Sequence, residues 1–455
     1  MEPFDLVIAN GQIVTAADTY TADIGVRGEK IACIGRGLRG RRTIDASGCL
    51  VIPGAVDVHV HLQMPLGDIT SSDDWRSGTM AAAHGGTTSI VDFVDPLPGQ
   101  PPLQALEERL AEAEGQACID YGLHMVLSDV SGKTLAQLSR MIDVGIPTFK
   151  LFMAYEGKCL TDDQLYLALR EIARLGALAL IHAENYPIIR LFVRELLAEG
   201  KTEPRWHPRS RPAIMEGEAT GRLIALAEMA GAHACIAHIS CAAVVCQIRA
   251  ARARGLPIYG ETCPQYLVLT QDVYERPDFE GARYVCSPPL RAEEDQAALW
   301  KALADGTLQV ISTDHCPWWW QDKERGRGDF SRIPGGVPGI ETRLSLTYHF
   351  GVRAGRLTPQ QWVNLCCTRP AELFGLPGKG KIQVGADADI VIFDPERVMP
   401  LTAERLHSQV DYSIYEDITV RGWPRATISR GRVLVEDGRF IGLVGHGRFI
   451  RRRLV

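Results

Sequence analysis

The chain has 455 residues, of which 46% are hydrophobic and 23% charged, and its formal net charge is −6. This composition is typical of a globular protein with a large core, and the mildly acidic balance argues against nucleic acid as a partner. The chain contains no apolar run of about 18 residues and no basic N-terminal segment followed by an apolar one. We therefore predict a cytoplasmic protein that does not interact with a membrane.

Short strand patterns fill both ends of the chain. Turn signals at Asn10-Gly11 and Gly28-Glu29 separate the N-terminal ones. Because chain termini commonly lie close together, we predict one small β-sandwich domain built from residues 1–52 and 375–455. The expected strands are 4–8, 12–15, 22–27, 30–34, 42–45, 389–394, 418–420, 426–429 and 432–435. A basic cluster at the C-terminus is interpreted as a solvated tail or a subunit contact: Arg448, Arg451, Arg452 and Arg453.

Between these ends, strand and amphipathic helix patterns alternate, which predicts a parallel sheet. Eight strands with intervening helices is the count of a (β/α)₈ TIM barrel, so we assign residues 53–374 to an α/β barrel domain. The active site of such a barrel lies at the C-terminal ends of its strands. The expected strands are 50–61, 87–93, 121–127, 148–152, 178–182, 235–239, 257–262 and 309–314. The expected helices include 73–84, 103–114, 161–175, 216–230, 242–254 and 293–305.

Side chains that can bind metal recur at the ends of the predicted strands. Asp57, His59 and His61 are spaced by two, which places them on one face of a strand. Two neighbouring imidazoles can bind one cation of the zinc type. Asp57 is expected to orient one of these metal ligands rather than to bind the cation itself. Later strands carry the remaining groups: Lys150, His182, His238 and Asp314.

Each of these groups has a simpler explanation when taken alone. His182 could be a hydrogen-bonded core histidine, Lys150 could extend to solvent, and Asp314 could cap a helix. Their joint position at strand ends, which converge at one mouth of a barrel, favours a metal site instead.

The residue types suit a hydrolase that uses two metal ions. Two cations held by histidines need an anionic bridge between them. A lysine among apolar neighbours has a lowered pKa, and its free amine can add carbon dioxide to form a carbamate with one oxygen for each metal. Lys150 is therefore the predicted bridge. Asp314 is the predicted terminal ligand and the base that takes a proton from the attacking water.

Nine motifs carry a family resemblance that spans essentially the whole chain. They are PGAVDVHVH (53–61), GTMAAAHGGTTSIVDF (78–93), FKLFMAY (149–155), IHAEN (181–185), SRP (210–212), ETCPQYL (261–267), SPPLR (287–291), STDHCP (312–317) and GADADIVIFDP (385–395). By these motifs the sequence resembles the dihydropyrimidinase/D-hydantoinase family of the amidohydrolase superfamily.

The resemblance implies two divalent metal ions, usually zinc, and a homotetramer. The first ion would be held by His59, His61, Lys150 and Asp314, and the second by Lys150, His182 and His238. In the family this lysine is carboxylated.

The resemblance also assigns the residues that contact substrate. Tyr155 matches a catalytic tyrosine that donates a hydrogen bond to the developing oxyanion. Ser287 matches the position whose backbone holds the cyclic imide. A second backbone contact usually comes from an asparagine, and Gly335 replaces it here. Two loops would face the substituent at ring position 5, and they offer Leu62, Met64, Leu66, Phe152, Tyr155 and Cys159.

These features predict a cyclic amidohydrolase that opens 5,6-dihydropyrimidines or 5-substituted hydantoins to N-carbamoyl amino acids. An allantoinase or another cyclic ureide hydrolase is the first alternative. A non-catalytic scaffold related to dihydropyrimidinases is the second, and the complete set of predicted ligands argues against it. Gln63 stands where dihydroorotases carry an arginine for a substrate carboxylate, which disfavours that activity.

Overall fold

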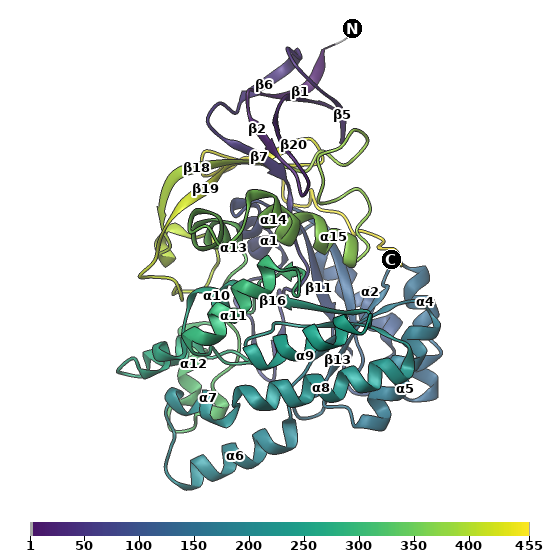
Figure 1. The fold of residues 1–455 in the computed structure, drawn as a ribbon, viewed down its shortest axis with the longest axis vertical. Coiled ribbons are helices and arrows are strands. Elements are labelled where there is room, and N and C mark those ends of the chain that lie inside the picture. The colour runs from purple at the N-terminus through teal and green to yellow at the C-terminus, as the bar shows by residue number, and fades with distance from the viewer. Residues whose placement is uncertain (1–2, 455) are drawn as a thin grey trace.

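An eight-stranded parallel sheet lies at the centre of the structure, a computed structural model that describes residues 3–454 (Figure 1). Its strands follow one another in chain order, and a parallel bridge between Val60 and His315 joins its two outer strands beyond their ends. The sheet is therefore a nearly closed barrel, and the predicted fold class is confirmed. The strands are β8 (Ala55–Asp57), β11 (Thr87–Val94), β12 (Asp120–Val126), β13 (Thr148–Phe152), β14 (Leu178–His182), β15 (His233–Ile236), β16 (Ile258–Thr262) and β17 (Val310–Ile311).

Helices cover the outside of the barrel, so most of its strands are buried on both faces, as their apolar composition requires. Asp74 and Thr161 cap two of these helices, each within a capping box. The long helices agree with the predicted ones to within a few residues: α1 (Trp75–His84), α2 (Pro102–Ala113), α5 (Asp162–Arg174), α8 (Ala213–Ala230), α9 (Ala242–Ala253) and α11 (Glu293–Ala304). The structure adds α6 (Tyr186–Ala198) and the short helices α3 (Gly132–Leu135), α4 (Leu138–Asp143), α7 (His207–Ser210), α10 (Pro264–Val268), α12 (Trp320–Lys323), α13 (Arg343–Thr347), α14 (Pro359–Val363) and α15 (Arg369–Leu373).

Strands from both ends of the chain form two further sheets above the barrel (Figure 1). A four-stranded sheet contains β1 (Phe4–Ala9), β4 (Asp23–Arg27), β5 (Lys30–Gly35) and β6 (Gly40–Asp45). A seven-stranded sheet contains β2 (Gln12–Val14), β3 (Thr19–Thr21), β7 (Leu50–Pro53), β18 (Ile390–Pro400), β19 (Thr419–Ser429), β20 (Arg432–Glu436) and β21 (Arg439–Phe440). Their side chains share one buried cluster, to which both ends of the chain contribute.

The prediction of one continuous barrel strand over residues 50–61 is wrong. It divides at Gly54, where β7 ends its pairing with β18 and β8 begins to pair with β11. A Cβ at Gly54 would lie only 2.1 Å from Thr88 Oγ1, so this close approach requires glycine. His59 and His61 consequently follow the end of β8 rather than lie on a strand.

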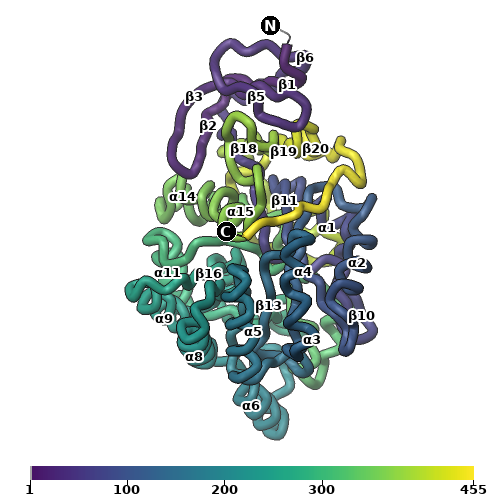
Figure 2. The backbone as a smooth tube through the Cα atoms, turned by 90° about the vertical axis from the view of Figure 1, so that its right-hand side faces the viewer, coloured from purple at the N-terminus to yellow at the C-terminus, as the bar shows by residue number. Residues whose placement is uncertain are grey.

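The C-terminal segment returns from the upper sheets to the side of the barrel (Figure 2). Its backbone pairs with β12, through the bonds from Tyr121 N–H to Arg448 O and from Ile450 N–H to Tyr121 O. Arg452 is only 3% exposed, and its guanidinium donates to Thr148 Oγ1 at the start of β13. The prediction of a solvated tail or a subunit contact is therefore wrong for Arg452, whose side chain is part of the barrel.

Across residues 3–454, no helix is both long enough and apolar enough to cross a membrane. All 12 cysteines are free thiols, and most of them are buried.

Candidate metal centre

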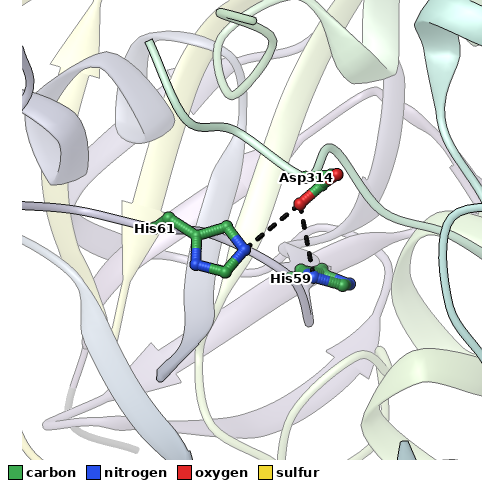
Figure 3. Close-up of side chains that lie close together, drawn as sticks. All are labelled: His59, His61 and Asp314. Carbon is green, nitrogen blue, oxygen red and sulfur yellow. Dashed lines mark ion pairs between the residues drawn. The ribbon is translucent and has the colours of Figure 1, made fainter. Parts of the chain in front are cut away.

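The C-terminal ends of the barrel strands bring the first predicted ligands together. His59 Nε2 and His61 Nε2 lie 3.3 and 3.2 Å from the same carboxylate oxygen of Asp314, and both rings point toward it (Figure 3). Lys150 Nζ, on β13, lies 3.5 Å from His59 Nε2. Ligand atoms of His59, His61 and Asp314 lie within 4.8 Å of one another, which is close enough for one metal ion.

The remaining predicted ligands lie beside this group. The ring centroids of His182 and His238 are 4.5 Å apart, and that of His238 is 5.4 Å from His59. Glu184 engages His182 Nε2 at 2.7 Å, which leaves Nδ1 of His182 as the nitrogen that can face a metal. The structure thus places all six predicted ligands around one mouth of the barrel.

Left-handed backbone conformations aim three side chains at the site. Asp314 has φ 52°, His238 φ 37° and Tyr155 φ 72°. Residues other than glycine rarely adopt the left-handed backbone region, and such strain persists only where the surrounding structure enforces it. His238 lies two residues beyond the end of β15 and Asp314 three residues beyond the end of β17, so both belong to loops at the mouth of the barrel.

Burial keeps the imidazoles in the form that binds metal. It lowers the pKa of His59, His182 and His238, so each ring is neutral near pH 7. Burial alone would raise the pKa of Asp314, but the neighbouring histidines hold it well below its usual range. The site therefore offers neutral nitrogens and an ionised carboxylate.

The setting of Lys150 favours a free amine. Its side chain is buried, and its Nζ lies 5.4 Å from the ring centroid of Phe93 and 5.3 Å from that of Phe152. Burial lowers its pKa to about 8, although Glu261 and Asp314 act in the opposite direction. An appreciable fraction of the side chain is then uncharged and nucleophilic near neutral pH.

A model of the amidohydrolase family matches residues 50–434. The chain belongs to the amidohydrolase family. It is 47% identical to a D-hydantoinase of Geobacillus stearothermophilus over 452 residues, which cover 98% of this chain and 96% of that relative.

Solved structures show which members of the amidohydrolase family this chain resembles. The chain is similar to a D-hydantoinase from Bacillus sp. AR9, with a TM-score of 0.97, 46% identity and coverage of 98% of this chain and 99% of that chain. It is equally similar to a dihydropyrimidinase from Brevibacillus agri NCHU1002, with a TM-score of 0.97, 44% identity and 98% coverage of both chains. This amidohydrolase therefore falls in the dihydropyrimidinase/D-hydantoinase family, and family membership implies a binuclear metal centre.

The donor set of this amidohydrolase fits such a centre. Neutral imidazoles and a carboxylate suit zinc-type cations, and a lysine with a free amine could supply a bridge once it is made anionic. Nδ1 of His238 is buried without a partner among the described residues, as expected where a ring is oriented mainly by a ligand.

Two carboxylates that sequence reasoning missed hold the histidines of the site. Glu261 on β16 is fully buried, hydrogen-bonds His59 Nδ1 and accepts from His238 N–H at 3.3 Å. Burial raises its pKa to about 8. Glu184 bridges His182 to Arg211, whose Nη1 lies 2.6 Å from its carboxylate. An acidic residue inside a predicted buried strand was the available signal for Glu261.

Replacing Glu261 with glutamine is expected to weaken metal binding about 10–100-fold, since partners that orient ligands typically contribute this much. Titration with a chelator, followed by metal analysis, measures the effect. Glutamine keeps the size of the side chain, and a variant that keeps its metal affinity would show that Glu261 has only a packing role.

The residues predicted to contact substrate occupy the same mouth. The ring centroid of Tyr155 lies 4.9 Å from that of His182, and Ser287 is close enough to hydrogen-bond Tyr155. Gly335 is exposed, and a Cβ built on it would lie 3.8 Å from Ser287 Oγ. Tyr155, Ser287 and Gly335 thus form one group beside the histidines.

The predicted substituent pocket is only partly compatible with the structure. Leu62 has no exposed surface and packs against Gly78 of α1, so it belongs to the core and is removed from the pocket. Met64 is half-buried and Leu66 is 45% exposed, so both can still face a ligand. Phe152 and Cys159 form a backbone bridge beneath the loop that carries Tyr155.

Proposed function

We propose that the protein is a cyclic amidohydrolase that opens the ring of 5,6-dihydropyrimidines or 5-substituted hydantoins and releases N-carbamoyl amino acids. The convergence of the six predicted ligands beside Tyr155 carries this proposal. The full-length similarity to D-hydantoinases and a dihydropyrimidinase supports the choice of substrate class.

The metal ligands that we propose follow the geometry of the site. The first ion would be held by His59, His61, Lys150 and Asp314, and the second by Lys150, His182 and His238. Lys150 would be carboxylated, and zinc is the proposed metal. When bound, the two ions would polarise the amide carbonyl and make the attacking water more acidic.

The side chains of the site have separate tasks in ring opening. Asp314 takes a proton from the attacking water and delivers it to the nitrogen that leaves. Tyr155 donates its hydroxyl proton in a hydrogen bond to the carbonyl oxygen as negative charge develops there. Burial raises the pKa of Tyr155, so the phenol keeps this proton at working pH. The backbone of Ser287 and Gly335 holds the imide part of the ring.

A steady-state panel tests the proposal. Dihydrouracil, hydantoin, phenylhydantoin, allantoin and dihydroorotate are offered to the metal-loaded protein, and the metal content is measured in parallel. We expect turnover of the first three and little of the last two. Turnover of allantoin alone would replace this function with the ureide alternative. A folded, metal-free protein without activity would support the scaffold alternative.

Cys159 offers a test of the substituent pocket. Cys159 is a small side chain whose backbone pairs with that of Phe152, so Cys159→Phe is expected to fill space that a bulky substituent needs. Each buried CH₂ of substrate is worth about 0.8 kcal/mol, so kcat/KM for phenylhydantoin should fall about tenfold or more. Hydantoin and dihydrouracil should be spared. An unchanged ratio of kcat/KM for phenylhydantoin over hydantoin would show that Cys159 faces away from the substrate.

Three further properties are part of the proposal. We propose a division into residues 1–52, 53–374 and 375–455, which is supported by the pairing of β7 with β18. We also propose a homotetramer, which the family suggests and which light scattering would test. A cytoplasmic location remains a prediction, to be tested by fractionation of the source cells.

A further inference from the structure

A buried lysine lies behind the loops that we propose to hold the substrate. Lys323, at the end of α12, has no exposed surface, and no ion pair involves it among residues 3–454. Its Nζ donates instead to three backbone carbonyls, those of Val285 at 3.0 Å, Pro334 at 2.8 Å and Gly336 at 2.8 Å. An ammonium group has three N–H donors and no acceptor, so all its hydrogen bonds are used here.

These carbonyls belong to the two segments that carry the proposed backbone contacts. We call residues 285–288 the serine loop and residues 334–336 the glycine loop. One direct bond joins them, from Gly336 N–H to Val285 O at 2.9 Å. Lys323 adds a bond to the serine loop and two to the glycine loop, so its side chain connects both.

Other side chains bind three more carbonyls of the two loops. Trp318 Nε1 donates to Gly335 O at 3.0 Å, His207 Nε2 donates to Cys286 O at 2.8 Å, and the Tyr266 hydroxyl donates to Pro288 O at 2.8 Å. Within residues 3–454, the backbone N–H and C=O of Ser287 and the N–H groups of Cys286 and Gly335 have no such partner. The free groups of Ser287 and Gly335 could pair with a cyclic imide, whose ring presents both N–H and C=O.

Burying the ammonium group of Lys323 without a negatively charged partner costs free energy, which argues that this lysine has a function. Burial lowers the pKa of Lys323 to about 7, because the ammonium gives up its hydration. Cys286 and Cys316 are the ionisable groups whose charge would raise the pKa of Lys323, but burial raises the pKa of both thiols, so neither supplies a negative charge near pH 7. A purely structural filler at this position would be apolar.

We propose that Lys323 is a positioning residue, which fixes the serine and glycine loops relative to each other and thereby sets the affinity for the cyclic imide ring. It touches neither the reacting atoms nor the proposed metal ligands, so its loss should act on ring binding more than on bond cleavage. The inference rests on the proposed function, because it assumes that the two loops hold the substrate.

Lys323→Met tests the proposal, because methionine keeps much of the volume but removes every donor. We expect KM for hydantoin and dihydrouracil to rise about tenfold or more, the loss expected when one or two backbone hydrogen bonds to the ring are weakened. The fall in kcat should be smaller than the rise in KM, and the metal content should equal that of the wild type. Lys323→Gln retains two N–H donors and should recover part of the affinity.

Arg452→Met is the matched control. Arg452 is also a buried cation that donates to backbone carbonyls, those of Phe374 and Leu123, but it lies at the opposite end of the barrel. Both variants should lower the melting temperature, and only Lys323→Met should change KM. Equal KM values in the two variants, or a fall in kcat with unchanged KM, would overturn the proposal.

A failure of this inference is distinguishable from a failure of the proposed function. If the wild type opens no cyclic imide, the function itself is wrong and so is the inference that rests on it. If the wild type is active and folded Lys323→Met has the wild-type KM, only the role of Lys323 is wrong.

Discussion

Lys150→Ala is expected to lose most of its bound metal and nearly all of its hydrolytic activity. The proposed carbamate would supply an oxygen to each ion, and without it the neutral imidazoles could not bridge two cations. The loss should be at least as large as the ~10²–10⁴-fold typical of a missing general base, because both ions are affected together. Metal analysis and steady-state turnover of hydantoin measure the two effects.

Short carboxylic acids provide the specific control for this variant. Acetate or propionate can enter the space left by the lysine and supply two oxygens, so partial recovery of metal and activity is expected. Lys158→Ala is the matched control, since Lys158 lies on the loop after the same strand and pairs with Asp95 instead. Retention of two tightly bound metal ions in Lys150→Ala would rule out the bridging role.

Asp314→Asn is expected to lower kcat by about 10²–10⁴-fold while part of the metal remains bound. The amide keeps one oxygen that can face a metal, but it cannot accept the proton of the attacking water. Asparagine also tolerates the left-handed backbone that this position requires, with φ 52°, so the loss would not reflect strain. Turnover per bound metal is the quantity to compare with the wild type.

Asp95→Asn is a suitable comparison for this change. Asp95 is a partly exposed carboxylate that pairs with Lys158 away from the histidines, so its activity should be nearly unchanged. A loss of less than about tenfold in Asp314→Asn would exclude Asp314 as the base, since a general base contributes more than this.

Local patterns in the sequence were sufficient to predict much of the fold. Alternating strand and helix signals located β13 and β14 at the residues where the structure has them. Strand ends in a barrel must meet at one mouth, so the position of each predicted ligand followed from its place after a strand. The grouping of His59, His61 and Asp314 was therefore accessible without a structure, although Asp314 is far from the others in sequence.

Tertiary structure alone decided which neighbours surround those groups. The partner of His59 is Glu261, which is 202 residues away, and no periodicity encodes such a pair. The division of the first strand at Gly54 depends on the approach of Thr88 from another strand. Leu62 has the composition of a pocket residue, but packing against α1 buries it.

Two basic residues show most clearly that sequence patterns do not reveal which charges are buried. Lys323 lies in a charged stretch and Arg452 in a basic tail, and both patterns are typical of solvated surface. Each is buried because backbone carbonyls from distant segments accept its hydrogen bonds. The sequence by itself determined which residue types stand at the strand ends, since that is a local property of spacing. Only the tertiary structure decided which charges are buried, because that depends on long-range packing and on the carbonyl groups it leaves without other partners.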